Sequence, residues 1–481
     1  MHAPSFKNCI NPLSLLLGAG GLLLVMRLWM SLCFFPISGW NNIRLTPSFM
    51  LRFGPTPYPG LDGGPLTTWI YGPVPLFLNL PATFAFDAAA ALIIAGVINL
   101  LIAVVPTGFV LFASSPSPQT ARWTDRAWAF LVCLALWPNS SLQYIQADNA
   151  AVGFGLVANF LLQRSCDRSW IQLLPAAICA ALAVWSKQTS LGLIFAQVLW
   201  LGVSSGGRAS INYTLACAAC GFALGGIFVA WFGFDGLWLN LVKLPSAIPF
   251  WADLRARTTG LGLHIAGYVL LPALALVIAR RAVWKRDSPW LLPALTWLCL
   301  LPLGLVSIYK IGGTANSLNG FIYLLPAAAL ALVTALRPWQ SRLTTALLAS
   351  GVAATILVQI NLSTTRSMRP LTEPLNQADY LASRFSGQIY FPWFPLVTYY
   401  SEHHFYHAED GLYARYTAQL APTRAAALRN LPARWSITVF FGPMTGWGII
   451  EQLHPPAVQK SSFGAWTVYS WTLLGSPAPQ P

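Results

Sequence analysis

Charged residues are scarce in this sequence. Asp, Glu, Lys and Arg make up 9% of the 481 residues, whereas 56% are hydrophobic. A soluble domain usually has about a quarter of its residues charged, so the composition excludes a soluble globular protein and indicates a polytopic membrane protein. Acidic residues are the scarcest, with 14 Asp and Glu against 28 Lys and Arg. A basic surplus can indicate nucleic-acid binding, but these cations lie between apolar runs, so no nucleic-acid partner is predicted.

Cysteine is also distributed unevenly. All eight cysteines precede Asn361, which excludes a disulfide framework in the C-terminal segment. Cys217 and Cys220 form a Cys-x-x-Cys pair inside an apolar run, where small residues favour helix packing. The first apolar run, residues 12–35, has no small-residue cleavage site and is longer than a signal-peptide core. We therefore expect it to be retained as a first membrane helix that enters from the cytoplasm.

The apolar runs predict a membrane domain of about eleven transmembrane helices. The predicted spans are 12–35, 87–113, 125–141, 149–164, 170–186, 188–205, 210–233, 262–281, 289–309, 320–336 and 343–362. Arg and Lys fall mostly in every second gap, at Arg122, Arg126, Arg164, Arg168, Arg208, Arg280, Arg281, Lys285, Arg286, Arg337 and Arg342. By the positive-inside rule that side is the cytoplasm, which leaves the N-terminus cytoplasmic and the C-terminus outside.

Two segments outside the membrane are large. Within the transmembrane domain, residues 1–362, the first outer loop at 36–86 is rich in Gly, Pro and aromatic residues, and its later half suits short interfacial helices. Residues 363–481 form the second segment. They alternate expected strands at 388–394, 435–441 and 465–472 with expected helices at 373–385 and 422–430. This pattern predicts a small extracytoplasmic α/β domain, which we call the tail.

The predicted topology places five membrane-domain acids outside, namely Asp62, Asp87, Asp148, Asp235 and Asp253. A Gly/Pro-shaped loop can hold the Asp62 carboxylate next to a substrate, although an Asp-Gly turn explains it too. Asp148 and Asn149 begin the fourth helix, where Asp148 either caps the helix or faces a substrate cavity. We interpret Asp87 as the cap of the second helix. Asp62 and Asp148 are therefore the candidate catalytic acids or bases.

Cations on the same side are candidates for binding a phosphate. Lys187 and Gln188 lie between two apolar helices with almost no loop, where a lysine suits a lipid-linked phosphate or extends to the interface. Lys310 opens a polar turn that includes Gly312, Gly313, Asn316 and Ser317, whose amides and hydroxyl suit phosphate or sugar.

Three further arginines and two histidines complete the candidates. Arg255 and Arg257 either bind a phosphate or are solvated charges of an outer loop. Arg27 lies inside the first helix, where its charge either has a functional role or extends to the membrane interface. His403 and His407 have the spacing of two metal ligands on one helix face, but no third ligand is evident. No metal site is assigned, and a divalent metal cofactor is left open.

The order of these motifs resembles the GT-C superfamily of membrane glycosyltransferases, in the branch similar to protein mannosyltransferases and the aminoarabinose transferase. The resemblance lies in Tyr71-Gly-Pro-Val-Pro-Leu-Phe, in Asp148-Asn149, in Ser186-Lys187-Gln188-Thr189, and in the turn from Lys310 to Ser317. It implies a GT-C-like fold with donor-phosphate ligands Lys187, Lys310, Arg255 and Arg257, and substrate contacts at Tyr71, Asn149, Gln188, Asn316 and Ser317.

One segment departs from that superfamily. Its catalytic acid usually follows the first helix, where this chain has Asn41 and Asn42. Asn cannot act as a general base, so Asp62 or Asp148 takes that role, or the chain binds substrate at Asn41 and Asn42 without turnover.

The resulting functional hypothesis is an inverting glycosyltransferase of the bacterial cytoplasmic (inner) membrane. It would move a sugar from a polyprenyl-phosphate donor to an extracytoplasmic glycan, lipid or protein acceptor. The alternatives are a non-catalytic GT-C-like subunit that binds lipid or glycan, and a transporter of lipid-linked sugars. A transporter would require ionisable residues within the spans and internal repeats, and apart from Arg27 the sequence has neither.

Overall fold

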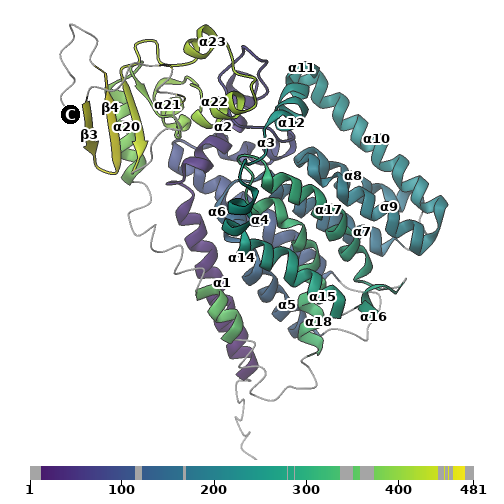
Figure 1. Ribbon diagram of the computed structural model, residues 1–481. Helices are drawn as coiled ribbons and strands as arrows, with labels where there is room; N and C mark the ends of the chain where they lie inside the picture. Colours follow the sequence, from purple (N-terminus) through teal and green to yellow (C-terminus); the bar gives the residue numbers. More distant parts are fainter. Residues whose placement is uncertain are drawn as a thin grey trace, which may run out of the picture.

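The computed structural model describes most of the chain. The described residues are 12–113, 122–165, 169–278, 280–285, 288–335, 350–357, 373–442 and 459–471, together with Ile449 and Leu453. They form a bundle of long helices with the tail at one end (Figure 1).

Helices occupy all ten of the predicted spans before residue 337. The main ones are α1 (Pro12–Phe34), α4 (Ala88–Phe112), α5 (Trp123–Leu136), α7 (Ala147–Arg164), α8 (Trp170–Ser186), α9 (Leu191–Ser205), α10 (Gly207–Phe232), α15 (Leu271–Ile278), α17 (Leu291–Tyr309) and α18 (Leu325–Ala335). The predicted span 343–362 lies largely outside the described residues, of which 350–357 are helical.

Five of the described helices are long and apolar enough to cross a membrane. They cover 17–34, 88–112, 207–232, 291–309 and 315–334, and a pair bent by 67° at residues 254–277 could be a sixth. Helix α5 has 14 residues and α9 has 15, which are fewer than the roughly 20 that a membrane core requires. The count of about eleven spans therefore stays a prediction.

The first outer loop is more helical than its sequence suggested. Its first half forms α2 (Gly39–Phe53), and its second half contains the short α3 (Val74–Leu78) and the 3₁₀ helix η1 (Leu80–Phe84). Ser38 caps α2 by accepting a hydrogen bond from the Asn41 backbone N–H. The helix accommodates Pro47 and buries Ile43 and Phe49, so apolar periodicity prevails over the helix-breaking residues.

A string of short helices connects α10 to α15. It consists of α11 (Phe234–Trp238), the π-helical η3 (Leu239–Lys243), α12 (Leu244–Ala247), α13 (Leu254–Gly260), α14 (Gly262–Ile265) and the π-helical η4 (Ala266–Leu270), and α16 (Arg280–Val283) follows α15. The 3₁₀ helices η2 (Gln188–Ser190) and η5 (Ala315–Leu324) lead into α9 and α18.

The tail contains a four-stranded sheet in the order β1-β2-β4-β3. Its strands are β1 (Ile389–Tyr390), β2 (Ile437–Phe441), β3 (Gln459–Phe463) and β4 (Trp466–Ser470); β1 pairs parallel with β2, and the other pairs are antiparallel. Its described helices are α20 (Glu373–Arg384), α21 (Pro395–Glu402), α22 (Glu409–Thr417) and α23 (Arg424–Arg429). The predicted strands at 435–441 and 465–472 and both predicted helices are confirmed, whereas β3, α21 and α22 were not anticipated.

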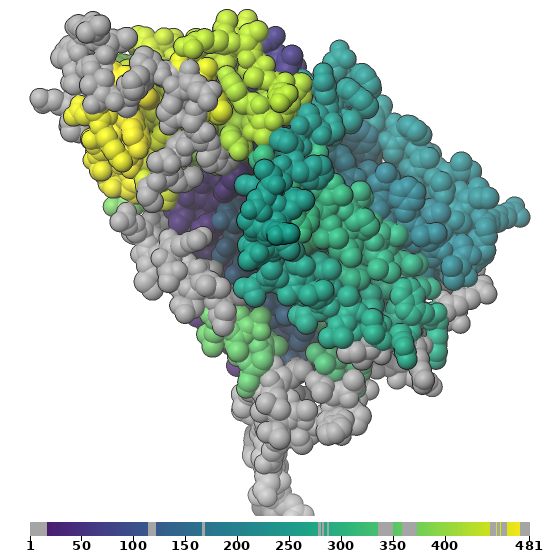
Figure 2. Space-filling model, in the orientation of Figure 1, coloured from purple at the N-terminus to yellow at the C-terminus, as the bar shows by residue number. Residues whose placement is uncertain are grey.

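The tail packs directly on one end of the bundle. One apolar core joins Phe35 and Phe49 of the bundle end to Trp393 and Leu396 of the tail. Hydrogen bonds cross the same boundary, including one from the Tyr400 hydroxyl to the Ala85 carbonyl at 2.9 Å. Figure 2 shows the yellow-green and yellow tail seated next to the teal segment near residue 240. The tail is therefore placed to shape any site at this end.

Candidate active site

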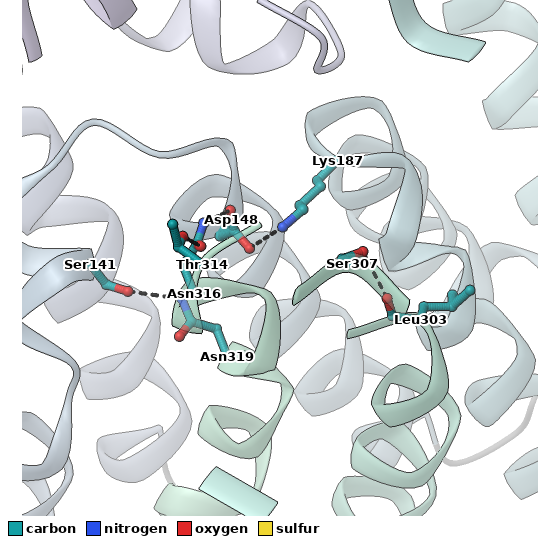
Figure 3. A network of polar contacts seen from close by, with 8 residues as sticks. All are labelled: Ser141, Asp148, Lys187, Leu303, Ser307, Thr314, Asn316 and Asn319. Atoms are coloured by element: carbon teal, nitrogen blue, oxygen red, sulfur yellow. Dashed lines mark hydrogen bonds and ion pairs between the residues drawn. The ribbon is translucent and has the colours of Figure 1, made fainter. Parts of the chain in front are cut away.

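A buried ion pair joins two of the predicted site residues. Asp148 lies in the first turn of α7, and Lys187 is the residue at which α8 ends. The Lys187 ammonium bonds to Asp148 Oδ1, and the two residues are 8% and 5% exposed (Figure 3). Of the two roles left open for Asp148, capping is not the one seen, because Gln146 occupies the cap position of α7. The carboxylate is thus free of a helix-capping role and faces a lysine.

Asn316 completes this cluster from a third segment. Its side-chain amide donates to Asp148 Oδ2 at 3.0 Å, and the Thr314 hydroxyl donates to Asn316 Oδ1. Both carboxylate oxygens of Asp148 therefore have a partner, each from a different motif that the sequence singled out. We call Asp148, Lys187 and Asn316 the acid–lysine cluster.

The acid–lysine cluster lines an open pocket between α7, α17 and η5. The cavity has a volume of about 30 Å³ and opens to the surface, and Ser317 lies on its wall. Its other polar walls are Thr189, Ser190, Asn319 and Tyr323. Thr189 ends the motif that begins at Ser186, whereas Ser190, Asn319 and Tyr323 were not predicted as site residues, although each lies within a few residues of a motif. A concave site with convergent polar groups is the usual form of a small-molecule site.

Neighbouring amides hold the cluster in place. Asn149, predicted to bind substrate, instead donates to Asn99 Oδ1 at 2.6 Å and to the Ser141 carbonyl at 2.7 Å. Asn319 donates to the Ser141 hydroxyl at 2.8 Å (Figure 3). These bonds fix the start of α7 against α4 and η5, so Asn149 braces the site.

Hydrogen bonds join the first outer loop to the turn at Lys187. The Gln188 side chain donates to the carbonyls of Ile70 and Leu241 at 2.8 and 2.9 Å. The Gly72 N–H donates to the Ser186 carbonyl at 3.2 Å, and the Lys187 nitrogen lies 5.9 Å from the centre of the Tyr71 ring. Tyr71 therefore reaches the cluster, whereas Gln188 holds the loop.

Two of the other three predicted phosphate ligands, Lys310 and Arg257, bind backbone carbonyls. Lys310 donates to the carbonyls of Pro245 and Ser246 at 2.6 and 3.1 Å. Arg257 donates to the carbonyl of Ile308, at 3.1 Å, and to that of Gly313. Arg255 is exposed on α13. Lys310 and Arg257 thus join the 243–260 segment to the turn after α17.

Asp62 lies at the boundary with the tail. Its carboxylate is exposed and accepts a hydrogen bond from the Thr423 backbone N–H at 2.8 Å. That bond lowers the pKa of Asp62 below its ordinary value, with smaller help from the nearby Arg429. The structure does not bring Asp62 into the lining of the pocket.

Asn41 and Asn42 are fully buried and join segments of the chain. Asn41 donates to the Gln143 carbonyl and accepts from the Ile145 N–H, both at 2.8 Å. Asn42 Oδ1 accepts from the Leu396 N–H of the tail at 2.9 Å. The Asn41 amide is therefore used on both sides, and substrate binding at Asn41 and Asn42 stays a prediction.

His403 and His407 do not share a helix face. Helix α21 ends at Glu402, and His403 follows in the left-handed conformation with φ 52°. His407 is buried, and its Nδ1 accepts the Leu66 N–H at 2.7 Å. Burial lowers the pKa of His407 to about 4. Among the described residues, no group of three His, Cys, Asp or Glu side chains could hold a metal.

The tail also buries charged groups that the sequence analysis did not consider. Arg415 of α22 donates to the Pro59 carbonyl at 3.0 Å and to Asn240 Oδ1 at 3.1 Å, and burial lowers its pKa to about 10. Asp410 of α22 is 6% exposed, and burial raises its pKa to about 6, although Thr68 and Arg44 lie close by. The acidic pair Glu409-Asp410 could have indicated these buried charges from the sequence.

Comparisons with known proteins identify the fold. Neither a protein-family model nor a curated protein matches the sequence. The crystal structure of ArnT from Cupriavidus metallidurans in the apo state superimposes with a TM-score of 0.58 over 94% of this chain and 98% of that one, at 10% identity. The chain has the fold of ArnT. The fold expected from the resemblance in the sequence is therefore confirmed.

A more distant similarity links the chain to an archaeal oligosaccharyltransferase. AglB from Archaeoglobus fulgidus, in complex with an inhibitory peptide and a dolichol-phosphate, gives a TM-score of 0.45 and 11% identity over 88% of this chain and 69% of that one. The apolar helices and the ArnT-like fold make the chain a multi-pass membrane protein.

Proposed function

We propose that the chain is a membrane glycosyltransferase that moves a sugar from a polyprenyl-phosphate donor to an extracytoplasmic acceptor with inversion. The observation that carries the proposal is the acid–lysine cluster, which places a carboxylate, an ammonium and an amide around one pocket. The ArnT-like fold supports the same reaction class.

The chemistry requires one base and one cation. The acceptor hydroxyl oxygen attacks the anomeric carbon, the bond from that carbon to the phosphate oxygen breaks, and its electron pair leaves with the phosphate. Asp148 takes the hydroxyl proton as general base. Lys187 binds the phosphate and stabilises the negative charge that grows on its leaving oxygen. Attack opposite the departing phosphate inverts the anomeric centre.

The ion pair is a resting arrangement in this mechanism. A donor phosphate that enters the pocket competes with Asp148 for the Lys187 ammonium, because both are anions. Lys187 then shifts toward the phosphate, and Asp148 keeps the Asn316 amide as its orienting partner. Binding of the donor thereby frees the carboxylate oxygen that must accept a proton.

The remaining predicted residues take secondary roles. Lys310 and Arg257 already bind carbonyl groups, so we assign them to the shape of the pocket rim. Arg255 is exposed and is a candidate contact for the phosphate of the arriving lipid. Asp62 is the alternative base, which the experiment below tests against Asp148.

The proposed orientation follows from the positive-inside rule. Figure 1 places α16, which begins with Arg280, at the end opposite the tail. We propose that this end faces the cytoplasm of a bacterium and that the tail and the pocket face the outside.

A transfer assay tests the proposal. Purified protein in lipid nanodiscs is incubated with radiolabelled undecaprenyl-phosphate sugars, and release of the free lipid phosphate is followed. We expect release with one sugar, its loss in Asp148→Asn and its retention in Asp62→Asn. Tight binding of every donor with no release under any acceptor would refute the enzyme and favour a binding subunit.

A further inference from the structure

Side chains of α2 hold the stretch of chain that leads into α7. This stretch, residues 143–146, continues from the short helix α6 (Asn139–Gln143), and we call it the α7 entry. Asp148 comes two residues after it, in the first turn of α7. Because the chain is continuous over so few residues, a shift of the α7 entry would move the Asp148 carboxylate as well.

Asn41 pairs with the α7 entry as a neighbouring strand would. Tyr144 is extended, with φ −124° and ψ 141°, so the carbonyl before it and the N–H after it point to one side. Asn41 donates to that carbonyl, of Gln143, and accepts from that N–H, of Ile145, both at 2.8 Å. Arg44, one turn further along α2, donates to the Ile145 carbonyl at 3.1 Å. Three hydrogen bonds from one helix thus hold this backbone.

The pairing requires an amide at position 41. A carboxylate could accept from the Ile145 N–H, but it has no donor for the Gln143 carbonyl. Asn41 is also fully buried, where a neutral side chain avoids the cost of burying a charge. At the position where the GT-C superfamily usually has its catalytic acid, this chain therefore has a side chain suited to holding backbone.

We propose that Asn41 is a positioning residue, which holds the α7 entry so that the Asp148 carboxylate stays at the pocket. This inference rests on the proposed function, in which Asp148 is the base. A base must lie within hydrogen-bond reach of the proton that it takes, and a displacement of about 1 Å can slow a reaction by roughly a hundredfold. The residues that line the pocket do not include Asn41, so its effect on the reaction passes through the α7 entry.

The first test compares Asn41→Ala in two backgrounds. Release of lipid phosphate is measured in single turnover with saturating donor, in lipid nanodiscs, for wild type, Asn41→Ala, Asp148→Asn and the double variant. We expect Asn41→Ala to slow release at least about tenfold in wild type. It should slow release less than about twofold when position 148 is already Asn, because no base remains to be misplaced. Donor affinity should be no weaker than in wild type, since Asn41 lies outside the pocket lining.

Two further variants and a control accompany this comparison. Asn41→Asp keeps the acceptor for Ile145 but loses the donor, so it should slow release too. Arg44→Met removes the bond to the Ile145 carbonyl at a less buried position, should slow release by a smaller factor, and serves if Asn41→Ala does not fold. Asn79→Ala is the control, because it removes a buried amide of the same loop that donates to the Pro75 carbonyl. It should release lipid phosphate at the wild-type rate.

A second measurement needs no turnover. The Asp148 carboxyl carbon is observed by NMR in protein labelled with carbon-13 at its Asp carboxyl groups, and its resonance is assigned by its absence from Asp148→Asn. This resonance reports the ion pair with Lys187, and it should move in Asn41→Ala but not in Asn79→Ala. A wild type that transfers no sugar would refute the proposed function, whereas the positioning would still be tested by this resonance.

Several results would overturn the inference. Release at the wild-type rate in Asn41→Ala, or an unmoved Asp148 resonance, would remove the positioning role. An equal loss of rate in both backgrounds would leave Asn41 with a role in stability alone. Faster release in Asn41→Asp would place residue 41 at the reacting atoms, and weaker donor binding at an unchanged rate would make it a substrate contact.

Discussion

Removing both members of the ion pair should cost no more stability than removing either one. Asp148 and Lys187 are 5% and 8% exposed and meet in a direct ion pair. Loss of one partner from such a pair leaves a buried charge without compensation and costs roughly 3–5 kcal/mol. Since the pocket lets water reach the surviving charge, we expect the lower end, about 3 kcal/mol, for Asp148→Asn and for Lys187→Met.

The double variant removes both charges at once. Asn at position 148 can still accept from the Asn316 amide, and Met fills the space of the lysine stem. We expect the double variant to cost no more than either single one, whereas independent effects would sum to about 6 kcal/mol. Activity should be lost in all three, because the base and the phosphate ligand do not compensate for one another.

The assay is unfolding by denaturant in mixed micelles for wild type, both single variants and the double variant. Stability and transfer activity are measured on the same preparations. A double variant that costs the sum of the two single ones would show that the charges do not interact, and would refute the reasoning. A double variant that recovers both stability and activity would exclude these residues from the chemistry.

Three further predictions concern packing, pH and the membrane. Gly72→Ala should abolish folding or activity, because a Cβ there would lie 1.7 Å from the Trp185 carbonyl oxygen, whereas Gly60→Ala, with nothing within 4 Å, should be tolerated in a thermal-shift assay. Burial raises the pKa of Asp379 to about 6, with a smaller contribution from the nearby Asp87 carboxylate. The folded state therefore binds a proton at Asp379 more tightly than the unfolded state does, and the contribution of Asp379 to the free energy of unfolding should rise as pH falls from about 7 to about 4. Asp379→Asn should raise the unfolding temperature at pH 7.5 but not at pH 4; a gain at both would contradict the assignment. Arg27→Met should destabilise the protein by at least about 2 kcal/mol, since the guanidinium bonds carbonyls at the end of α5; unchanged stability in denaturant would show that these bonds contribute nothing.

The sequence singled out the residues of the acid–lysine cluster but did not show which partner each would bind. Asp148, Lys187 and Asn316 stand out as polar groups beside apolar runs, and the fold brings all three together. Lys310 and Arg257 stand out for the same reason, yet they bind carbonyls on a neighbouring turn. Hydropathy marks where charges lie along the chain, whereas the choice of partner depends on contacts between distant segments.

The elements with regular apolar patterns were the most predictable. Long apolar helices and the strands at β2 and β4 follow from local periodicity. Helix α2 was missed because its Asn pair and Pro47 resemble a loop, although Ile43 and Phe49 provide its buried face. The docking of the tail was also out of reach, because it depends on Leu396 meeting Asn42 across more than three hundred residues.

The most direct test of the account is a single-turnover measurement with saturating donor. Wild type and Asp148→Asn are mixed with the undecaprenyl-phosphate sugar identified in the transfer assay, and donor affinity and the rate of lipid-phosphate release are measured separately. We predict donor affinity at least as tight as in wild type, because Asn at position 148 no longer competes for Lys187, and a rate reduced by roughly a hundredfold or more in Asp148→Asn, as loss of a general base requires. An unchanged release rate in that variant would contradict the assignment of the acid–lysine cluster as the site of transfer.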